Sequence, residues 1–294
     1  MTTMKLTHSP VTPVPAKRAR TRLGRAVQAI PIVVFGLYVL IGAFGPLIVD
    51  YDPVRGNLDD RLLSPGSVTS DGTTAVFGTD ALGRDLLGQM VYGARTSITI
   101  GLLVVVFSGL VGTVVGTFAG YRRGITDLVV SRIIDVLLAF PGILLAIVIA
   151  GVFARSLAIV VIALSVTNWV GFARLSRSMA MSLRERDWVK SAVVMGVPRS
   201  TIVARHILPF LAGPTLALAT TEFAGAILAE ASLSFLGMGL PSSSVSWGQT
   251  IAAGKEYLAS AWWISAIPGI ALAVLVISVG FTGDRFTRHV SRRQ

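Results

Sequence analysis

The sequence predicts an all-α membrane protein that crosses the bilayer with six helices and keeps both termini in the cytoplasm. Of its 294 residues, 53% are hydrophobic and only 14% are charged, and the mean hydropathy is +0.72. A soluble domain carries about 25% charged residues, and disordered chains are more polar still. A transmembrane helix needs about 20 consecutive apolar residues, and six stretches of this chain reach or approach that length.

The six stretches follow one another between residues 27 and 281. The first is longer than the apolar region of a signal peptide and has no cleavage site after it, so we expect an uncleaved helix. The third is broken by Pro141-Gly142, and the fifth carries Pro214 and two glutamates. The approximate bounds are 27–49, 97–121, 133–153, 157–173, 210–236 and 262–281.

The basic residues set the orientation. Most of the 26 Lys and Arg fall in four segments on one side of the predicted spans, and the positive-inside rule makes that side cytoplasmic. The formal charge of +11 therefore reflects topology, and we expect no nucleic-acid partner. The four segments are a basic disordered tail at 1–26, the connection 122–132, the loop 174–205 and a basic tail at 285–294. The opposite side holds the Pro-, Gly- and Asp-rich loop region 50–96.

The chain lacks the residues that several kinds of site require. It has no cysteine, which excludes disulfides, thiolate metal sites and a Cys nucleophile, and its three histidines lie far apart in sequence. A phosphate-binding loop needs G-x-x-x-x-G-K-[ST]. The Gly254-Lys255 pair lacks both the first glycine and the final hydroxyl residue. We therefore expect no cofactor or metal on this chain and no enzymatic activity of its own.

The loop between the fourth and fifth stretches has a pattern of its own. It reads RERDWVKSAVVMGVP from Arg184 to Pro198 and RSTIVARHILP from Arg199 to Pro209. This pattern predicts two short amphipathic helices joined at 196–198, because Gly ends a helix at positive φ and Pro opens the next. One face of the first helix needs a partner, either lipid headgroups or another protein. That face is formed by Trp188, Val189, Ala192 and Val193.

The same loop resembles the EAA loop of ABC-importer permeases. The pattern of that loop is E-A-A, three residues, Gly, nine residues and then I-x-L-P. In this chain the corresponding positions are Lys190-Ser191-Ala192, Gly196 and His206-Ile207-Leu208-Pro209. Lys190 replaces the usual acidic residue, and His206 replaces the usual isoleucine.

The external region strengthens the resemblance. The sequences FGTDALGRD from Phe77 and YGARTS from Tyr92 are similar to the signature of the C-type permease subunit of dipeptide, oligopeptide and nickel importers. The likeness continues in consistent order from about residue 27 to 289. Further matching segments are 135–141 (DVLLAFP), 230–237 (EASLSFLG), Pro241 with 246–248 (SWG), and Trp262-Trp263 with Pro268-Gly269.

This resemblance implies a type-I ABC-importer permease of the bacterial inner membrane, with a core at 97–284. The chain would form half of a translocation pore for small peptides and work by alternating access. The implied partners are a homologous second permease, two cytoplasmic ABC ATPases that carry ATP and Mg, and an external solute-binding protein. Nickel or another small solute is an alternative substrate. Alternatives from other classes are an ion-gradient-driven secondary transporter and a non-transporting scaffold.

The resemblance also assigns residues. It implies that the cytoplasmic loop 174–209 couples the permease to the ATPases, with Gly196 as a hinge and with Trp188 and Val193 as anchors. The implied coupling residues are Arg186, Asp187, Trp188, Lys190, Ser191, Ala192, Val193 and Gly196.

Charged and small residues within the spans allow further predictions. A charge at mid-bilayer costs about 2.5–3.5 kcal/mol, so each needs a reason. Asp135 can pair with Arg132 one turn away. Glu222 and Glu230 lie about 80° apart around their helix, and either line the translocation pathway or make interhelical hydrogen bonds. We expect close helix packing at Gly109, Gly112, Gly116 and Gly120, and structural roles for Arg84 and Asp85.

Overall fold

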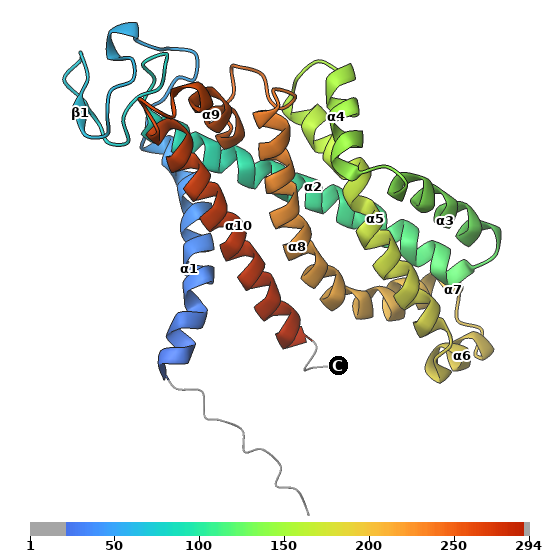
Figure 1. Ribbon diagram of the computed structural model, residues 1–294. Coiled ribbons are helices and arrows are strands. Elements are labelled where there is room, and N and C mark those ends of the chain that lie inside the picture. The colour runs from blue at the N-terminus through green and yellow to red at the C-terminus, as the bar shows by residue number, and fades with distance from the viewer. Residues whose placement is uncertain (1–21, 291–294) are drawn as a thin grey trace, which may run out of the picture.

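The computed structural model describes residues 22–290, which are mostly helical (Figure 1). Most of the predicted tail at 1–26 and the last four residues of the tail at 285–294 lie outside the described residues. Five segments are long and apolar enough to cross a membrane, and a bent pair of helices makes a sixth candidate span. The predicted all-α membrane fold is confirmed, while the side on which the termini lie stays a prediction.

Five long helices supply most of the spans. They are α1 (Arg22–Phe44), α2 (Leu86–Arg122), α5 (Leu157–Arg184), α8 (Leu208–Phe235) and α10 (Trp263–Val290). α2 runs obliquely across the molecule in Figure 1 and begins eleven residues before the predicted span. Its start is set by Asp85, whose carboxylate accepts a hydrogen bond from the backbone N–H of Gly88 at 2.9 Å. The predicted structural role of Asp85 is confirmed.

The third predicted span is not one helix. α3 (Ile125–Leu138) and α4 (Gly142–Val152) meet at 85°, and each is too short to cross a bilayer alone. Pro141 precedes the first turn of α4, where its missing N–H does no harm, and the chain changes direction there. The predicted break of the stretch 133–153 at Pro141-Gly142 is confirmed, and it is a sharp turn between two helices. α3 also occupies most of the predicted connection 122–132.

α2 and α5 pack closely along a row of glycines, as predicted. A Cβ atom built on Gly112, Gly116 or Gly120 would lie 2.2–2.4 Å from a backbone carbonyl oxygen of α5. Only glycine allows the two backbones to approach so closely. At Gly109 the same atom would lie 3.7 Å from the Phe172 ring, which is ordinary contact. Three of the four glycines are therefore essential to this crossing.

α1 and α10 lie side by side, and aromatic side chains of α1 contact α8 and Trp247 (Figure 1). The ring of Phe35 in α1 meets that of Phe223 in α8 edge to face, with centroids 5.9 Å apart. Tyr38 contacts Trp247 in the same manner and donates a hydrogen bond to the carbonyl of Ala271 at 3.1 Å. These contacts join α1 to the other spans.

The segment between α1 and α2 is compact and largely non-helical. It contains two 3₁₀ turns (Gly45–Leu47 and Leu58–Asp60) and a small antiparallel pair, β1 (Ser67–Val68) with β2 (Thr74–Ala75). Buried Asp80 accepts hydrogen bonds from Arg84 at 2.7 Å and Gln89 at 2.9 Å. The predicted structural role of Arg84 is therefore confirmed. At the same end of the molecule lie α9 (Trp247–Gly254) and the 3₁₀ turn Lys255–Tyr257.

Candidate functional site

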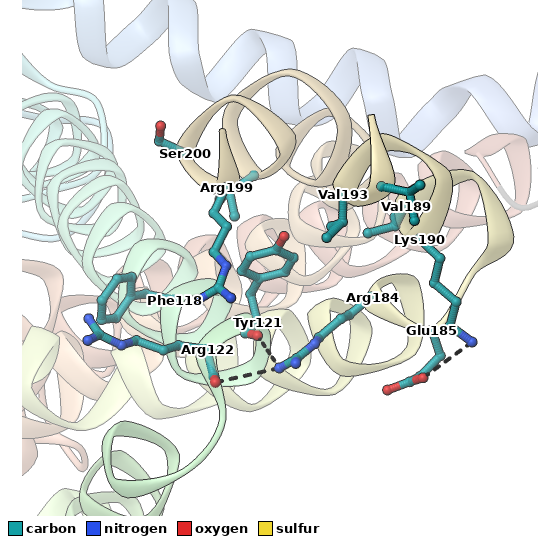
Figure 2. Close-up of a pocket in the computed structure, with 12 residues that line it drawn as sticks. Phe118, Tyr121, Arg122, Arg184, Glu185, Val189, Lys190, Val193, Arg199 and Ser200 are labelled. Carbon is teal, nitrogen blue, oxygen red and sulfur yellow. Dashed lines mark hydrogen bonds and ion pairs between the residues drawn. The ribbon is translucent and has the colours of Figure 1, made fainter. Parts of the chain in front are cut away.

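A cavity of about 810 Å³ opens where α2 and α5 end (Figure 2). Its other wall is formed by two short helices, α6 (Asp187–Val194) and α7 (Arg199–Ile202). The wall combines apolar side chains with four cations and one carboxylate. The lining residues are Phe118, Tyr121, Arg122, Arg184, Glu185, Val189, Lys190, Val193, Val194, Arg199, Ser200 and Val203.

Gly196 ends α6 in the left-handed region, at φ +78°. Its N–H donates to the carbonyl of Val193 at 3.0 Å, and the N–H of Val197 donates to that of Ala192 at 3.0 Å. This pair of bonds is the Schellman motif, which favours glycine because a side chain is strained at positive φ. Pro198 follows and precedes α7. The predicted two helices joined at 196–198 are confirmed.

The predicted apolar face of α6 is divided between two environments. Val189 and Ala192 are buried in a cluster that includes Ile202 and Ile207 of the same chain. Val193 is 49% exposed and lines the cavity. The expectation that this whole face awaits a partner is therefore wrong, because half of it packs inside the protein.

Trp188 packs on the start of α8. Its ring stacks on Phe210, with centroids 5.7 Å apart and an interplanar angle of 23°, and meets His206 edge to face. The side chain keeps 38% of its surface exposed. Trp188 therefore holds α6 against α8, and only part of it is free to serve as the predicted anchor for an ATPase.

α7 continues into α8 without a break. A π-helical turn, Val203–Ile207, joins them, and Pro209 lies in the first turn of α8. Residues 199–235 thus form one 37-residue segment that reaches from the cavity through the fifth span.

Polar contacts join the end of α5 to the end of α2 and to α6. Arg184 donates a hydrogen bond to the carbonyl of Tyr121 at 2.7 Å, in the last turn of α2, where a cation is also favoured by the helix dipole (Figure 2). Glu185 pairs with Arg123 at 2.8 Å and with Lys190 at 3.6 Å. Sequence reasoning missed the contacts of Arg184 with Tyr121 and of Glu185 with Arg123, because about 60 residues separate the partners and no local pattern marks them.

The remaining predicted coupling residues form an outer surface. Arg186, Asp187 and Ser191 are exposed, as is Met195 at the end of α6, which was not among the predicted coupling residues, and none of the four lines the cavity. Asp187, Ser191 and Met195 recur every four residues and so share one face of α6. We call these three residues the outer face of α6. It remains open to a partner.

Comparison with known proteins identifies the family. Residues 112–294 match the family described as binding-protein-dependent transport system inner membrane component. The chain belongs to this family. It is a non-catalytic permease subunit of an ABC importer, with several spans in the inner membrane.

Curated relatives cover most of the permease. A putative peptide transport system permease protein of Brucella suis is 39% identical over 90% of this chain and 88% of its own. The dipeptide transport system permease protein DppC of Alkalihalophilus pseudofirmus is 35% identical, over 86% and 81% of the two chains. The oligopeptide transport system permease protein OppC of Haemophilus influenzae is 35% identical over 71% and 67%.

A solved structure supports the fold. The permease matches a chain of the inward-facing MetNI methionine ABC transporter with a TM-score of 0.57 and 20% identity. The match covers 70% of this chain and 97% of that one. It confirms the predicted fold class of an ABC-importer permease.

The permease holds its membrane carboxylates in different settings. Glu230 is fully buried and accepts hydrogen bonds from Ser246 at 2.6 Å and from Ser234 at 2.8 Å, which is the interhelical role that the sequence left open. Glu222 is partly exposed and makes no hydrogen bond or ion pair with residues 22–290. Asp135 pairs with Arg132 at 3.7 Å, as predicted.

Proposed function

We propose that this permease forms half of a translocation pathway for small peptides, and that two ABC ATPases drive it through the outer face of α6. The observation that carries this proposal is the junction of α6 and α7 with three spans. Arg184 and Glu185 bind the end of α2, α6 follows directly from α5, and α7 runs into α8. Relatives named as peptide transport permeases support the substrate class.

The proposed mechanism is mechanical. Nucleotide closure in the ATPases moves α6, and the spans joined to it move as rigid bodies because packed helices slide or rotate rather than deform. ATP and Mg belong to the ATPases. A second, homologous permease completes the pore, and a solute-binding protein delivers the peptide to the region 50–96.

ATP hydrolysis tests this function directly. The complex is purified through this chain, and its activity is measured with peptide-loaded binding protein, with empty binding protein and with nickel in place of peptide. We expect the ATPases to co-purify with this chain. We also expect peptide-loaded binding protein to stimulate ATP hydrolysis, and the empty and nickel-loaded forms not to. Stimulation by nickel would reassign the substrate. A chain that purifies alone and supports uptake after reconstitution with an ion gradient would contradict the proposal and favour a secondary transporter.

The outer face of α6 can be tested separately. Met195 is 73% exposed and touches neither the cavity nor the core, so Met195→Glu should leave the fold intact and weaken ATPase binding about tenfold or more. Val54→Glu changes an equally exposed residue in the region 50–96 and serves as the control. Equal co-purification of ATPase with both variants would show that the coupling surface is not the outer face of α6.

We also propose that Glu222 meets the ammonium group of the peptide in the pathway. Its carboxylate faces Gly171 of α5, where a built Cβ atom would lie 3.1 Å from Oε1. An unpaired carboxylate inside a span is costly without a partner, and a peptide amine would supply one. Glu222→Gln should slow transport of peptides with a free amino terminus and leave N-acetylated peptides unaffected. Equal transport of both peptides by the variant and the wild type would refute this role.

A further inference from the structure

The cavity carries an excess of positive charge. Arg122, Arg184, Lys190 and Arg199 line it, and Glu185 is the single carboxylate among the lining residues. Glu185 is already shared between Lys190 and Arg123, which lies just outside the cavity. Among the side chains that the structure describes, at 29–283 and 285, Arg199 has no hydrogen-bond or ion-pair partner. The cavity therefore favours an anion.

The other part of the cavity is apolar. Phe118, Val193, Val194 and Val203 line it, and Val194 is 87% exposed. Figure 2 shows Phe118 beside the Arg122 side chain, whose guanidinium lies 5.6 Å from the Phe118 ring centre. A free inorganic anion would gain nothing from these apolar side chains. They favour a ligand that joins an anionic group to hydrocarbon.

An apolar stripe on α2 leads into the cavity. Leu110, Val114 and Phe118 recur every four residues, lie on one face of the helix and are more than half exposed. The cavity itself lies where two candidate spans end, Leu86–Arg122 and Leu157–Arg184. The ends of spans lie at the level of lipid headgroups, and the stripe lies at the level of acyl chains.

We propose that this cavity binds the headgroup of an anionic phospholipid, with Arg122 and Arg199 at the phosphate and the acyl chains along Phe118 and Val114. Basic pockets between spans on the cytoplasmic side are suited to such headgroups. The volume of about 810 Å³ is within the range of sites for small molecules. The outer face of α6 points elsewhere, so the lipid and a docked ATPase occupy different surfaces. This site goes beyond the proposed transport function and does not depend on it.

Binding of short-chain lipids to the purified full chain tests the proposal. The probes are dihexanoyl-phosphatidylglycerol, dihexanoyl-phosphatidylcholine and glycerol phosphate, each titrated below its micelle concentration in calorimetry. We expect phosphatidylglycerol to bind at least tenfold more tightly than the other two. Arg122→Gln and Arg199→Gln should each weaken it about fivefold, the effect of one basic side chain at a membrane surface.

Arg205→Gln is the matched control, because Arg205 lies six residues from Arg199 on the same segment, is exposed and does not line the cavity. Arg205→Gln should change the affinity less than twofold, and Arg199→Lys should retain the affinity of the wild type. Equal losses of lipid affinity in the Arg199 and Arg205 variants would show that general surface charge, and not the cavity, causes the binding.

Two further outcomes would overturn the proposal. Glycerol phosphate binding as tightly as the lipid would indicate a site for free anions. The second outcome concerns the purified complex with its ATPases, which we expect to bind phosphatidylglycerol with the same affinity as the isolated chain. If the ATPases displace the lipid competitively, the cavity belongs to the ATPase interface and not to the membrane.

Discussion

At the scale of single residues, Glu230 joins three elements of the permease. Its carboxylate accepts hydrogen bonds from Ser97 of α2, Ser234 of α8 and Ser246 at the start of α9, and the residue is fully buried. Glu230→Ala would leave these hydroxyl groups without their acceptor and would open a cavity. We expect it to lower the free energy of unfolding by roughly 2–5 kcal/mol. Thermal unfolding in detergent measures this loss.

Glu222→Ala is the control on the same helix. Glu222 makes no hydrogen bond or ion pair with the described residues, so its loss should change the unfolding midpoint much less. Equal shifts in the two variants would show that neither the burial of Glu230 nor its hydrogen bonds determine its contribution to stability.

Substitutions at Gly196 measure the effect of backbone conformation separately from steric contact. A Cβ atom at this position meets nothing within 4 Å, so a substitution is opposed by the positive φ alone. Gly196→Ala should destabilise the α6–α7 junction by about 1–2 kcal/mol, and Gly196→Asn by less, because Asn tolerates this region. Hydrogen exchange of the α6 amides reports the change.

Gly225 provides the comparison for Gly196. A Cβ atom there also meets nothing within 4 Å, but the residue lies inside α8 with no positive φ. Gly225→Ala should be neutral or stabilising, since alanine is the better helix former. If Gly196→Ala were equally harmless, the Schellman motif would not be what fixes the α6–α7 junction.

At the scale of elements, the α2–α5 crossing depends on backbone contact. Gly116→Ala would place a Cβ atom 2.2 Å from the carbonyl oxygen of Ala173, and the helices would have to separate. We expect a loss of about 1–3 kcal/mol, measured by thermal unfolding. Gly109→Ala, with 3.7 Å to the Phe172 ring, should be tolerated. A similar loss in both variants would argue against close approach as the cause.

Sequence patterns identified the spans but not their full lengths. α2 begins eleven residues before its apolar stretch and α5 continues eleven beyond its own, because helical turns that are less apolar than the stretches themselves extend both helices. The 85° turn at Pro141 could not be predicted, since proline marks a break but not its angle. In the candidate site, periodicity gave the two short helices and their junction. It could not divide the face of α6 between core and cavity, which depends on contacts with distant Ile202 and Phe118.

At the scale of the whole molecule, the chain has two chemically different ends. One end holds the compact segment between α1 and α2, with Asp60 and Asp80 buried in hydrogen bonds. The other end holds the cavity, α6 and the start of α1 (Figure 1). Basic residues gather at the second end, and the positive-inside rule predicts that this end is cytoplasmic. Substrate delivery and ATP-driven motion would then act from opposite sides of the membrane.

The natural absence of cysteine allows this orientation to be measured without removing any residue. Ser182→Cys lies at the exposed end of α5, and Ser243→Cys lies in the exposed loop between α8 and α9 at the other end of the molecule. In intact cells with a permeable outer layer, a membrane-impermeant maleimide should label the Ser243 variant at once and the Ser182 variant only after lysis. The reverse pattern would invert the topology. It would place the outer face of α6 away from any cytoplasmic ATPase, and the proposed coupling would fail with it.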